Sequence, residues 1–102
     1  MVGIVICAAA AISMAAGDAT AGKAIFTKSC QPCHGADGSG NPNIAKMMNV
    51  TMRPLGSADV QAQSDDVLKG IVTGGRGKMR PVTSVTGKSV DDVIAYVRTL
   101  KK

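Results

Sequence analysis

The feature that most constrains this chain of 102 residues is the stretch SCQPCHG, residues 29–35. It holds two cysteines separated by two residues and, directly after them, the only histidine of the sequence, His34. Two thiols and one imidazole at this spacing can form a disulfide, a redox pair, a metal site or a covalent attachment site for a cofactor. Each interpretation makes a different demand on the rest of the chain.

Three of these interpretations fit the sequence poorly. A disulfide between Cys30 and Cys33 would close a very short loop and restrain little of the unfolded chain. A thioredoxin-type redox pair follows a strand within a βαβ unit, and no convincing strand precedes the motif. A structural zinc site needs four protein ligands, and the chain offers no second cluster of Cys or His.

The fourth interpretation is covalent attachment of c-type haem, for which C-x-x-C-H is the signature. Cys30 and Cys33 would form thioethers to the porphyrin, and His34 would lie under the iron as its first axial ligand. The composition agrees, because Phe26 and Tyr96 are the only aromatic residues and so small a domain needs support for its core. We therefore expect one covalently bound haem c with its iron.

The second axial ligand decides what the iron can do. A methionine closes the site and raises the potential, whereas an open position allows ligand binding or peroxide chemistry. The candidates are Met47, Met48, Met52 and Met79. Met79 follows a glycine-rich stretch between two predicted helices, where the chain can wrap around a flat guest, whereas Met52 comes soon after His34. We expect Met79 to be the ligand, with Met52 as the alternative.

The first sixteen residues carry no charge and are almost all apolar or small. This run is shorter than the about 20 residues of a membrane span and is typical of a cleaved export signal. No Lys or Arg precedes it, so an uncleaved anchor is the alternative. Cys7 follows Ile6 rather than the small residue expected before a lipid-attachment cysteine. We expect a signal at 1–16, a single domain at 17–102 and a location in the periplasm.

The domain is expected to be all-α, with about four short helices and no strand. We predict helices at about 19–29 and 44–49, from the N-cap Ser64 to Gly74, and from a capping box of Ser89 and Asp92 to the C-terminus. The last helix has a clear amphipathic stripe, formed by Val90, Val93, Ile94, Val97 and Leu100.

The chain is basic, with a net charge of +5. Such an excess favours steering toward an acidic partner, and solubility is the simpler explanation. We predict that Lys28, Arg76, Lys78 and Arg80 form a basic rim for brief docking of redox partner proteins. Nucleic-acid binding is not expected, because the basic residues are scattered and aromatic side chains for base stacking are almost absent.

In these motifs the sequence resembles the small monohaem class I cytochromes c, such as bacterial cytochromes c and cytochrome c6. The resemblance is carried by GKAIF (22–26), CQPCHG (30–35), GGRGKMRP (74–81) and DDVIAYVRTL (91–100). It implies a bundle of helices wrapped around the haem, with the first and last helices crossing at Gly22 beside Phe26 and Tyr96. It also implies that Pro42 or a neighbouring carbonyl accepts the N–H of the proximal imidazole.

The function implied is that of a monomeric electron carrier rather than an enzyme, shuttling single electrons between respiratory or photosynthetic partners. The alternative is a haem enzyme or gas-binding sensor with an open sixth position, although the sequence has no second His for acid–base chemistry near the iron. A subunit whose haem mainly serves folding is a third possibility. Membrane contact is expected only through an uncleaved segment 1–16. One departure from the family is that Arg80 stands between Met79 and Pro81.

Overall fold

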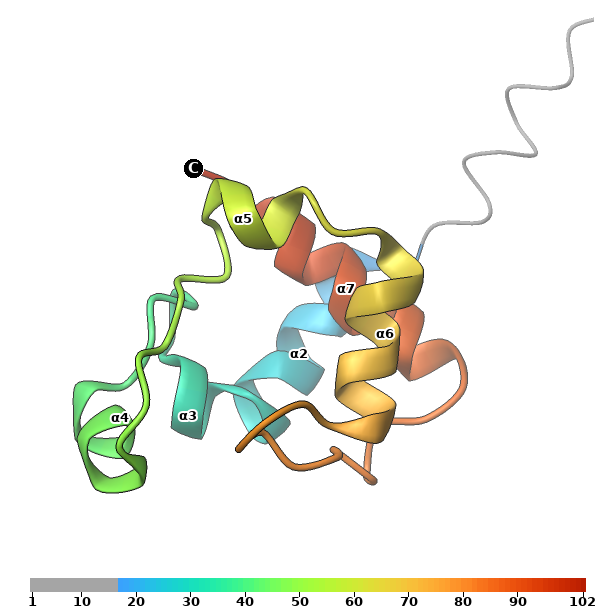
Figure 1. Cartoon of the computed structure of the whole chain (residues 1–102). Helices are drawn as coiled ribbons and strands as arrows, with labels where there is room; N and C mark the ends of the chain where they lie inside the picture. The colour runs from blue at the N-terminus through green and yellow to red at the C-terminus, as the bar shows by residue number, and fades with distance from the viewer. Residues whose placement is uncertain (1–16) are drawn as a thin grey trace, which may run out of the picture.

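The computed structural model describes residues 17–102, which form six helices and no extended strand (Figure 1). In chain order these are α2 (Ala19–Ser29), α3 (Gln31–His34), α4 (Pro42–Met48), α5 (Ala58–Gln61), α6 (Asp65–Gly74) and α7 (Lys88–Thr99). The predicted all-α fold is confirmed. None of these helices is long and apolar enough to cross a bilayer. The predicted export signal at 1–16 and Cys7 lie outside the described residues.

Capping side chains set the starts of several helices. The carboxylate of Asp18 accepts hydrogen bonds from the amides of Thr20 and Ala21, at 2.9 and 3.3 Å, and so begins α2. Ser64 begins α6 as predicted, because its hydroxyl accepts a hydrogen bond from the amide of Val67 at 3.1 Å. Both side chains satisfy amides that would otherwise have no partner at a helix start.

The predicted capping box of α7 is wrong. The helix begins after Gly87, no side chain caps it, and Ser89 lies inside its first turn. The Asp92 carboxylate instead accepts hydrogen bonds from the amide of Asp18 and the ammonium of Lys88, both at 2.8 Å. A residue that looked like part of a local cap therefore joins the start of α2 to α7.

The main helix contact is the crossing of α2 over α7, and α6 packs on α7 beside it (Figure 1). Gly22 makes the crossing possible, because a side chain there would collide with the backbone carbonyl of Asp92. One turn later the rings of Phe26 and Tyr96 pack at a centroid distance of 5.2 Å and an angle of 55°. The arrangement agrees with the crossing implied by the resemblance.

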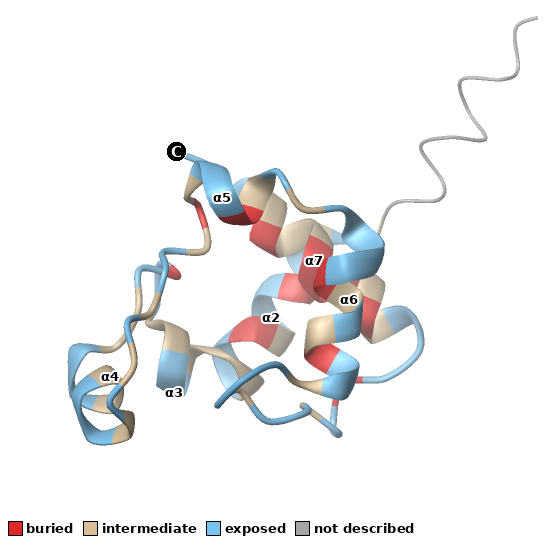
Figure 2. Cartoon of the chain, in the orientation of Figure 1, coloured by how far each residue is buried: buried red, intermediate tan, exposed pale blue. Residues whose placement is uncertain are grey.

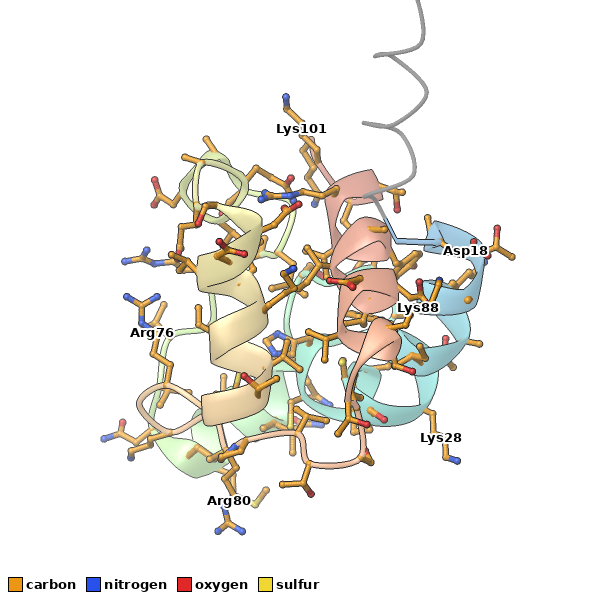
Figure 3. The ribbon with its side chains drawn as sticks, turned by 90° about the vertical axis from the view of Figure 1, so that its right-hand side faces the viewer. Asp18, Lys28, Arg76, Arg80, Lys88 and Lys101 are labelled. Atoms are coloured by element: carbon orange, nitrogen blue, oxygen red, sulfur yellow. The ribbon has the colours of Figure 1, made fainter. Side chains whose placement is uncertain are left out.

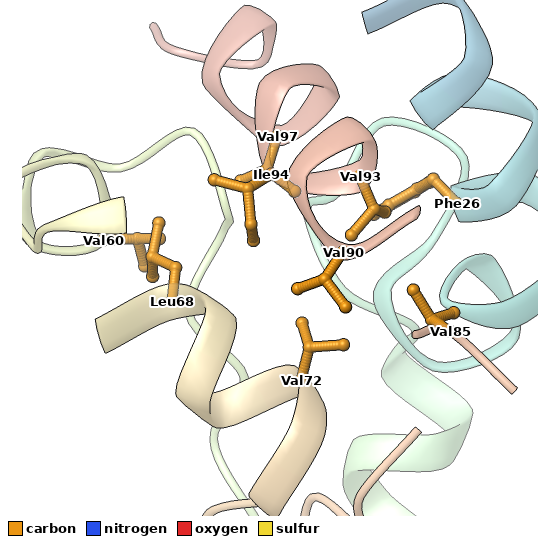
Figure 4. Close-up of a cluster of buried hydrophobic side chains, with 9 residues drawn as sticks. All are labelled: Phe26, Val60, Leu68, Val72, Val85, Val90, Val93, Ile94 and Val97. Carbon is orange, nitrogen blue, oxygen red and sulfur yellow. The ribbon is translucent and has the colours of Figure 1, made fainter. Parts of the chain in front are cut away.

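The hydrophobic core lies among α2, α6 and α7 (Figures 2 and 4). Its buried members are Phe26, Val60, Leu68, Val72, Val85, Val90, Val93, Ile94 and Val97. Neither α3 nor α4 contributes a buried residue. The part of the molecule formed by α3 and α4 therefore has no buried hydrophobic core of its own.

We expect Gly22→Ala to destabilise the protein strongly, because the added methyl group meets backbone that cannot move aside. The loss should be about 3 kcal/mol or more, since overpacking against side chains alone costs about 1–3 kcal/mol. The matched control is Gly70→Ala in α6, where nothing lies within 4 Å of an added Cβ. That variant should be slightly more stable than the wild type, by about 0.5–1 kcal/mol. Thermal unfolding of the two variants tests this, and equal midpoints would contradict the crossing.

Asp92 should make the stability of the fold sensitive to acid. The amide of Asp18, and next the ammonium of Lys88, hold the pKa of the Asp92 carboxyl below its ordinary value. A depressed carboxyl pKa stabilises the folded state above the ordinary value, and this contribution is lost as the pH falls through the folded value. Asp92→Asn should therefore be less stable than the wild type at neutral pH, and the difference should shrink below about pH 4. Thermal midpoints measured across this pH range test the prediction, with Asp66→Asn, at an exposed side chain, as the control. A difference in stability between Asp92→Asn and the wild type that does not change with pH would contradict it.

Candidate cofactor site

The Cys-x-x-Cys-His motif directly follows α2, and its last four residues are the single turn of α3. Cys30 ends α2 and begins α3, and its carbonyl accepts a hydrogen bond from the amide of His34 at 2.9 Å. Residues one helical turn apart project on the same side, so Cys30 and His34 lie beside each other. Gly35, at a φ of 81°, then ends the turn. The local fold thus brings the motif's cysteine and histidine to one surface.

A large cleft opens at that surface. Its inner part has a volume of about 430 Å³ and its outer part about 800 Å³. The two parts share wall residues Cys30, His34, Thr51, Arg76 and Met79, so they belong to one cleft. Each part lies within the range of about 300–1,000 Å³ that is common for cofactor and ligand sites. Core residues form much of the inner wall, including Phe26, Leu68, Val72, Val93, Ile94 and Val97.

The two thiols are not joined to each other. Cys30 is half-buried and Cys33 is exposed, and neither forms a disulfide within residues 17–102. Burial, and then the neighbouring Cys33, raises the pKa of the Cys30 thiol, which keeps it protonated at neutral pH. Nor does the described part of the chain hold a group of three Cys, His, Asp or Glu side chains fit for a metal ion. The disulfide and zinc interpretations therefore gain no support.

His34 has the properties of a ligand to a guest. Burial lowers the pKa of its imidazole, which favours the neutral form that binds metals. Its Nδ1 atom is buried and finds no hydrogen-bond partner among residues 17–102. A buried nitrogen without a partner is uncommon and calls for an explanation. Two thiols, this imidazole and a cleft of suitable size together fit a covalently attached haem.

Met79 lies in the wall of both parts of the cleft, together with His34. The chain reaches it through a tight turn in which the amides and carbonyls of Arg76 and Met79 exchange hydrogen bonds, both at 2.9 Å. Gly75 and Gly77 adopt φ values of 78° and 58°, which most residues avoid. The glycine-rich stretch therefore builds a turn that presents this methionine to the cleft.

The other methionines are placed differently. Met52 lines only the outer part of the cleft and packs on Gly40, where an added Cβ would lie 4.0 Å from its sulfur. The Gly40 amide donates a hydrogen bond to the His34 carbonyl at 2.7 Å, so Met52 lies against the loop that carries the imidazole. Met48 also lines only the outer part, and Met47 is 73% exposed. Met79 is therefore better placed than Met52 to face His34 across the cleft.

Pro42 is not brought to the imidazole. It is the exposed first residue of α4 and lines neither part of the cleft. The hydrogen bond predicted from the imidazole is not seen within residues 17–102, where Nδ1 of His34 has no partner. Asn41, which precedes Pro42, is instead hydrogen-bonded to the Cys-x-x-Cys-His motif. Its backbone amide donates to the Cys33 carbonyl, and its side-chain amide donates to the Pro32 carbonyl, both at 3.0 Å. The Asn-Pro pair favours the start of a turn, and this is the local signal in the sequence for the position of Asn41.

A group of polar residues in the inner wall of the cleft was not predicted from the sequence. They are Thr51, Arg53 and Gln63, which accompany Arg76 there. Arg76 donates a hydrogen bond to the Gln63 side chain at 3.3 Å, and Arg53 lies 3.9 Å from the Asp59 carboxylate. Guanidinium groups beside a mainly apolar cavity are suited to hold carboxylates of a bound guest. Only the folded chain shows that these positions meet.

Comparison with known proteins gives a consistent result. The family model described as cytochrome c matches residues 19–101. Cytochrome c-554(547) of Halothiobacillus neapolitanus is 30% identical over 91 residues, which cover 84% of this chain and all of that protein. A solved structure, the KustC0563 c-type cytochrome, is similar with a TM-score of 0.67 and 25% identity, covering 79% of this chain and 98% of that one.

Proposed function

The chain belongs to the cytochrome c family, and from this premise we propose that its haem is attached at Cys30 and Cys33, with iron bound by His34 and Met79. The family itself implies covalently bound haem c and electron transfer, and its members are electron carriers rather than enzymes. One observation supports the ligand assignment above all. The cleft has His34 and Met79 in the walls of both its parts.

Bound haem supplies an iron that takes up and releases one electron at a time. The protein residues set the conditions for this. A neutral His34 would offer a nitrogen lone pair to the iron, and the thioether of Met79 would be the second ligand and raise the potential. The mainly apolar inner wall would keep water away, and Arg53 and Arg76, which also line it, would bind the haem carboxylates. The exposed Cys33 lies at the edge where we expect electrons to pass.

The basic rim predicted from the sequence supports a proposal about partners. Of the eight cations outside this rim, four form ion pairs with Asp side chains, namely Arg53, Lys69, Lys88 and Arg98. Within residues 17–102, Lys28, Arg76, Lys78 and Arg80 form none, and Figure 3 shows Lys28 and Arg80 projecting outward from the same end of the molecule. We propose docking to acidic redox proteins in the periplasm, with this chain acting as a monomer in respiratory or photosynthetic electron transport.

Electron exchange with reduced flavodoxin, used as an acidic partner, tests this proposal. The holoprotein should show a reversible one-electron couple, and the rate of its reduction should fall as ionic strength rises. Arg80→Gln should lower the rate, whereas Lys101→Gln, which removes the same charge from the opposite end in Figure 3, should not. A rate that is independent of salt would refute acidic docking, and the absence of a reversible couple would refute the carrier function.

A further inference from the structure

The guanidinium of Arg98, near the C-terminal end of α7, donates five hydrogen bonds, as many as the group has N–H donors. The acceptors are the Asp65 carboxylate at 2.7 and 3.0 Å, the carbonyl and side-chain oxygens of Gln61 at 2.9 and 3.5 Å, and the Gln63 carbonyl at 2.6 Å. All of them lie in the connection between α5 and α6, residues 61–65. A planar fork of donors can hold several acceptors at once, which a lysine cannot do.

A second set of hydrogen bonds fastens the same connection. The side-chain amide of Gln61 donates to the Leu55 carbonyl at 2.9 Å and to the Val97 carbonyl at 3.1 Å. Figure 1 shows α5 beside the C-terminal end of α7, where these contacts are made. The connection 61–65 is therefore fixed to the last turns of α7 by side chains from both elements.

Gln63 carries this restraint to the cleft. Its backbone carbonyl is held by Arg98, and its side chain lines the inner part of the cleft. There its side-chain oxygen accepts the hydrogen bond from the Arg76 guanidinium at 3.3 Å. Arg76 also belongs to the turn that presents Met79, since the backbones of these two residues are hydrogen-bonded to each other. Arg98 is not among the described residues that line either part of the cleft, so it acts there only through its neighbours.

The Arg76 side chain depends on this support. Arg76 is exposed and forms no ion pair within residues 17–102, whereas Arg53, the other arginine of the inner wall, lies beside the Asp59 carboxylate. Holding a long exposed side chain in one place costs conformational entropy, so a fixed partner is needed to keep it there. A positive charge held near an iron atom disfavours Fe(III) relative to Fe(II) and so raises the reduction potential.

We propose that Arg98 is a positioning residue for the electron-transfer site: by holding Gln63, it keeps the Arg76 guanidinium along the inner wall of the cleft. The consequence for the iron rests on the proposed binding of haem in this cleft. When the fork is lost, the connection 61–65 shifts more easily, and the Gln63 oxygen no longer has a fixed place. The positive charge of Arg76 then moves away from the iron, and the reduction potential falls although both axial ligands are unchanged.

Hydrogen exchange of the holoprotein tests the first half of the proposal and does not depend on what binds the iron. Arg98→Lys keeps the charge but lacks the fork, so it should lower the protection of amides in 61–68 by about tenfold, the effect of losing hydrogen bonds from a charged donor. Asp92→Asn is the matched control, because it weakens the contact of α7 with the start of α2 instead. In that variant the protection of 61–68 should match the wild type. Equal protection in Arg98→Lys and the wild type would overturn the proposal.

Reduction potentials of the holoproteins test the second half. Arg98→Lys and Gln63→Ala should each shift the relative affinity toward Fe(III) by about three- to tenfold, which is a fall of about 30–60 mV at 59 mV per tenfold. Asp92→Asn should leave the potential unchanged, which separates positioning from a general loss of stability. In the double variant the second substitution should lower the potential no further, because both act through one contact.

Two results would show that Arg98 does not act in this way. If Arg98→Lys loosens the connection 61–65 but leaves the potential unchanged, Arg98 only stabilises the fold, and the proposal fails. If the two falls in potential add in the double variant, Arg98 does not act through Gln63, and the proposal fails as well. A wild type without a reversible couple would instead refute the carrier function, and the exchange experiment would still decide whether Arg98 fixes Gln63.

Discussion

A variant with both Cys30 and Cys33 replaced by serine, prepared without haem, is expected to be largely unfolded. The inner cleft penetrates the core, and its walls include Phe26 and the buried side chains of α6 and α7. Without haem the apolar side chains that line this space of about 430 Å³ would face water, and each Å² left exposed forfeits about 25 cal/mol of stabilisation. The whole stability of a small domain is only about 5–15 kcal/mol, so a loss of this kind is large.

Far-ultraviolet circular dichroism provides the measurement, with the haem-loaded wild type as reference. The single variant Cys33→Ser, matured with haem, is the control, because Cys30 and His34 would still hold the cofactor and the fold should persist with reduced stability. Full native helicity in the haem-free double variant would show that the protein side chains alone complete the core. The account of the cleft would then be wrong.

The second large effect is expected for Met79→Ala. The thioether of methionine is a soft ligand and favours Fe(II), so its removal should lower the reduction potential. We expect a fall of about 100 mV or more, which corresponds to about a fiftyfold change in the relative affinity for the two oxidation states at 59 mV per tenfold. A redox titration followed by visible absorption measures it directly.

Met52→Ala is the matched control for this variant. Both methionines stand before an Arg-Pro pair, but Met52 packs on Gly40 and lines only the outer cleft. Its removal should shift the potential little. If Met52→Ala lowers the potential and Met79→Ala does not, the assignment of the second axial ligand is reversed.

Much of the fold was accessible from the sequence because its long helices carry strong local signals. The first helix, predicted at about 19–29, is α2 (Ala19–Ser29), and Ser64 begins α6 through the hydroxyl contact expected of it. The apolar stripe of α7 is buried from Val90 to Val97. In each case periodicity and capping chemistry act over a few neighbouring residues, so they are visible in the chain itself.

The errors occur where local signals are short or tertiary contacts prevail. Helices α3 and α5 are single turns, too short for a hydrophobic period to show. Helix α4 begins at Pro42 rather than at residue 44, because Asn41 caps it and proline suits a first turn. Asp92 looked like a capping residue but bonds to Asp18, far away in the chain.

The candidate site, like the fold, could be predicted from the sequence only in part. The spacing of Cys30, Cys33 and His34 indicates haem attachment without any structure. From the sequence, the choice between Met79 and Met52 depends on loop composition alone. In space they differ because Met79 lines both parts of the cleft, whereas Met52 lines only the outer part and packs on Gly40. Arg53, Gln63 and the hydrogen bond of Lys78 to Met48 depend on segments that meet only after folding, so no pattern in the sequence contains them.

The visible spectrum of the reduced, haem-loaded wild type, recorded with and without carbon monoxide, tests whether two protein ligands close the iron site. We expect carbon monoxide to leave the spectrum unchanged on the time scale of mixing, because His34 and Met79 would occupy both axial positions of the iron. A prompt spectral change would show an open sixth position. That result would contradict the closed electron-carrier site and favour ligand-binding or peroxide chemistry instead.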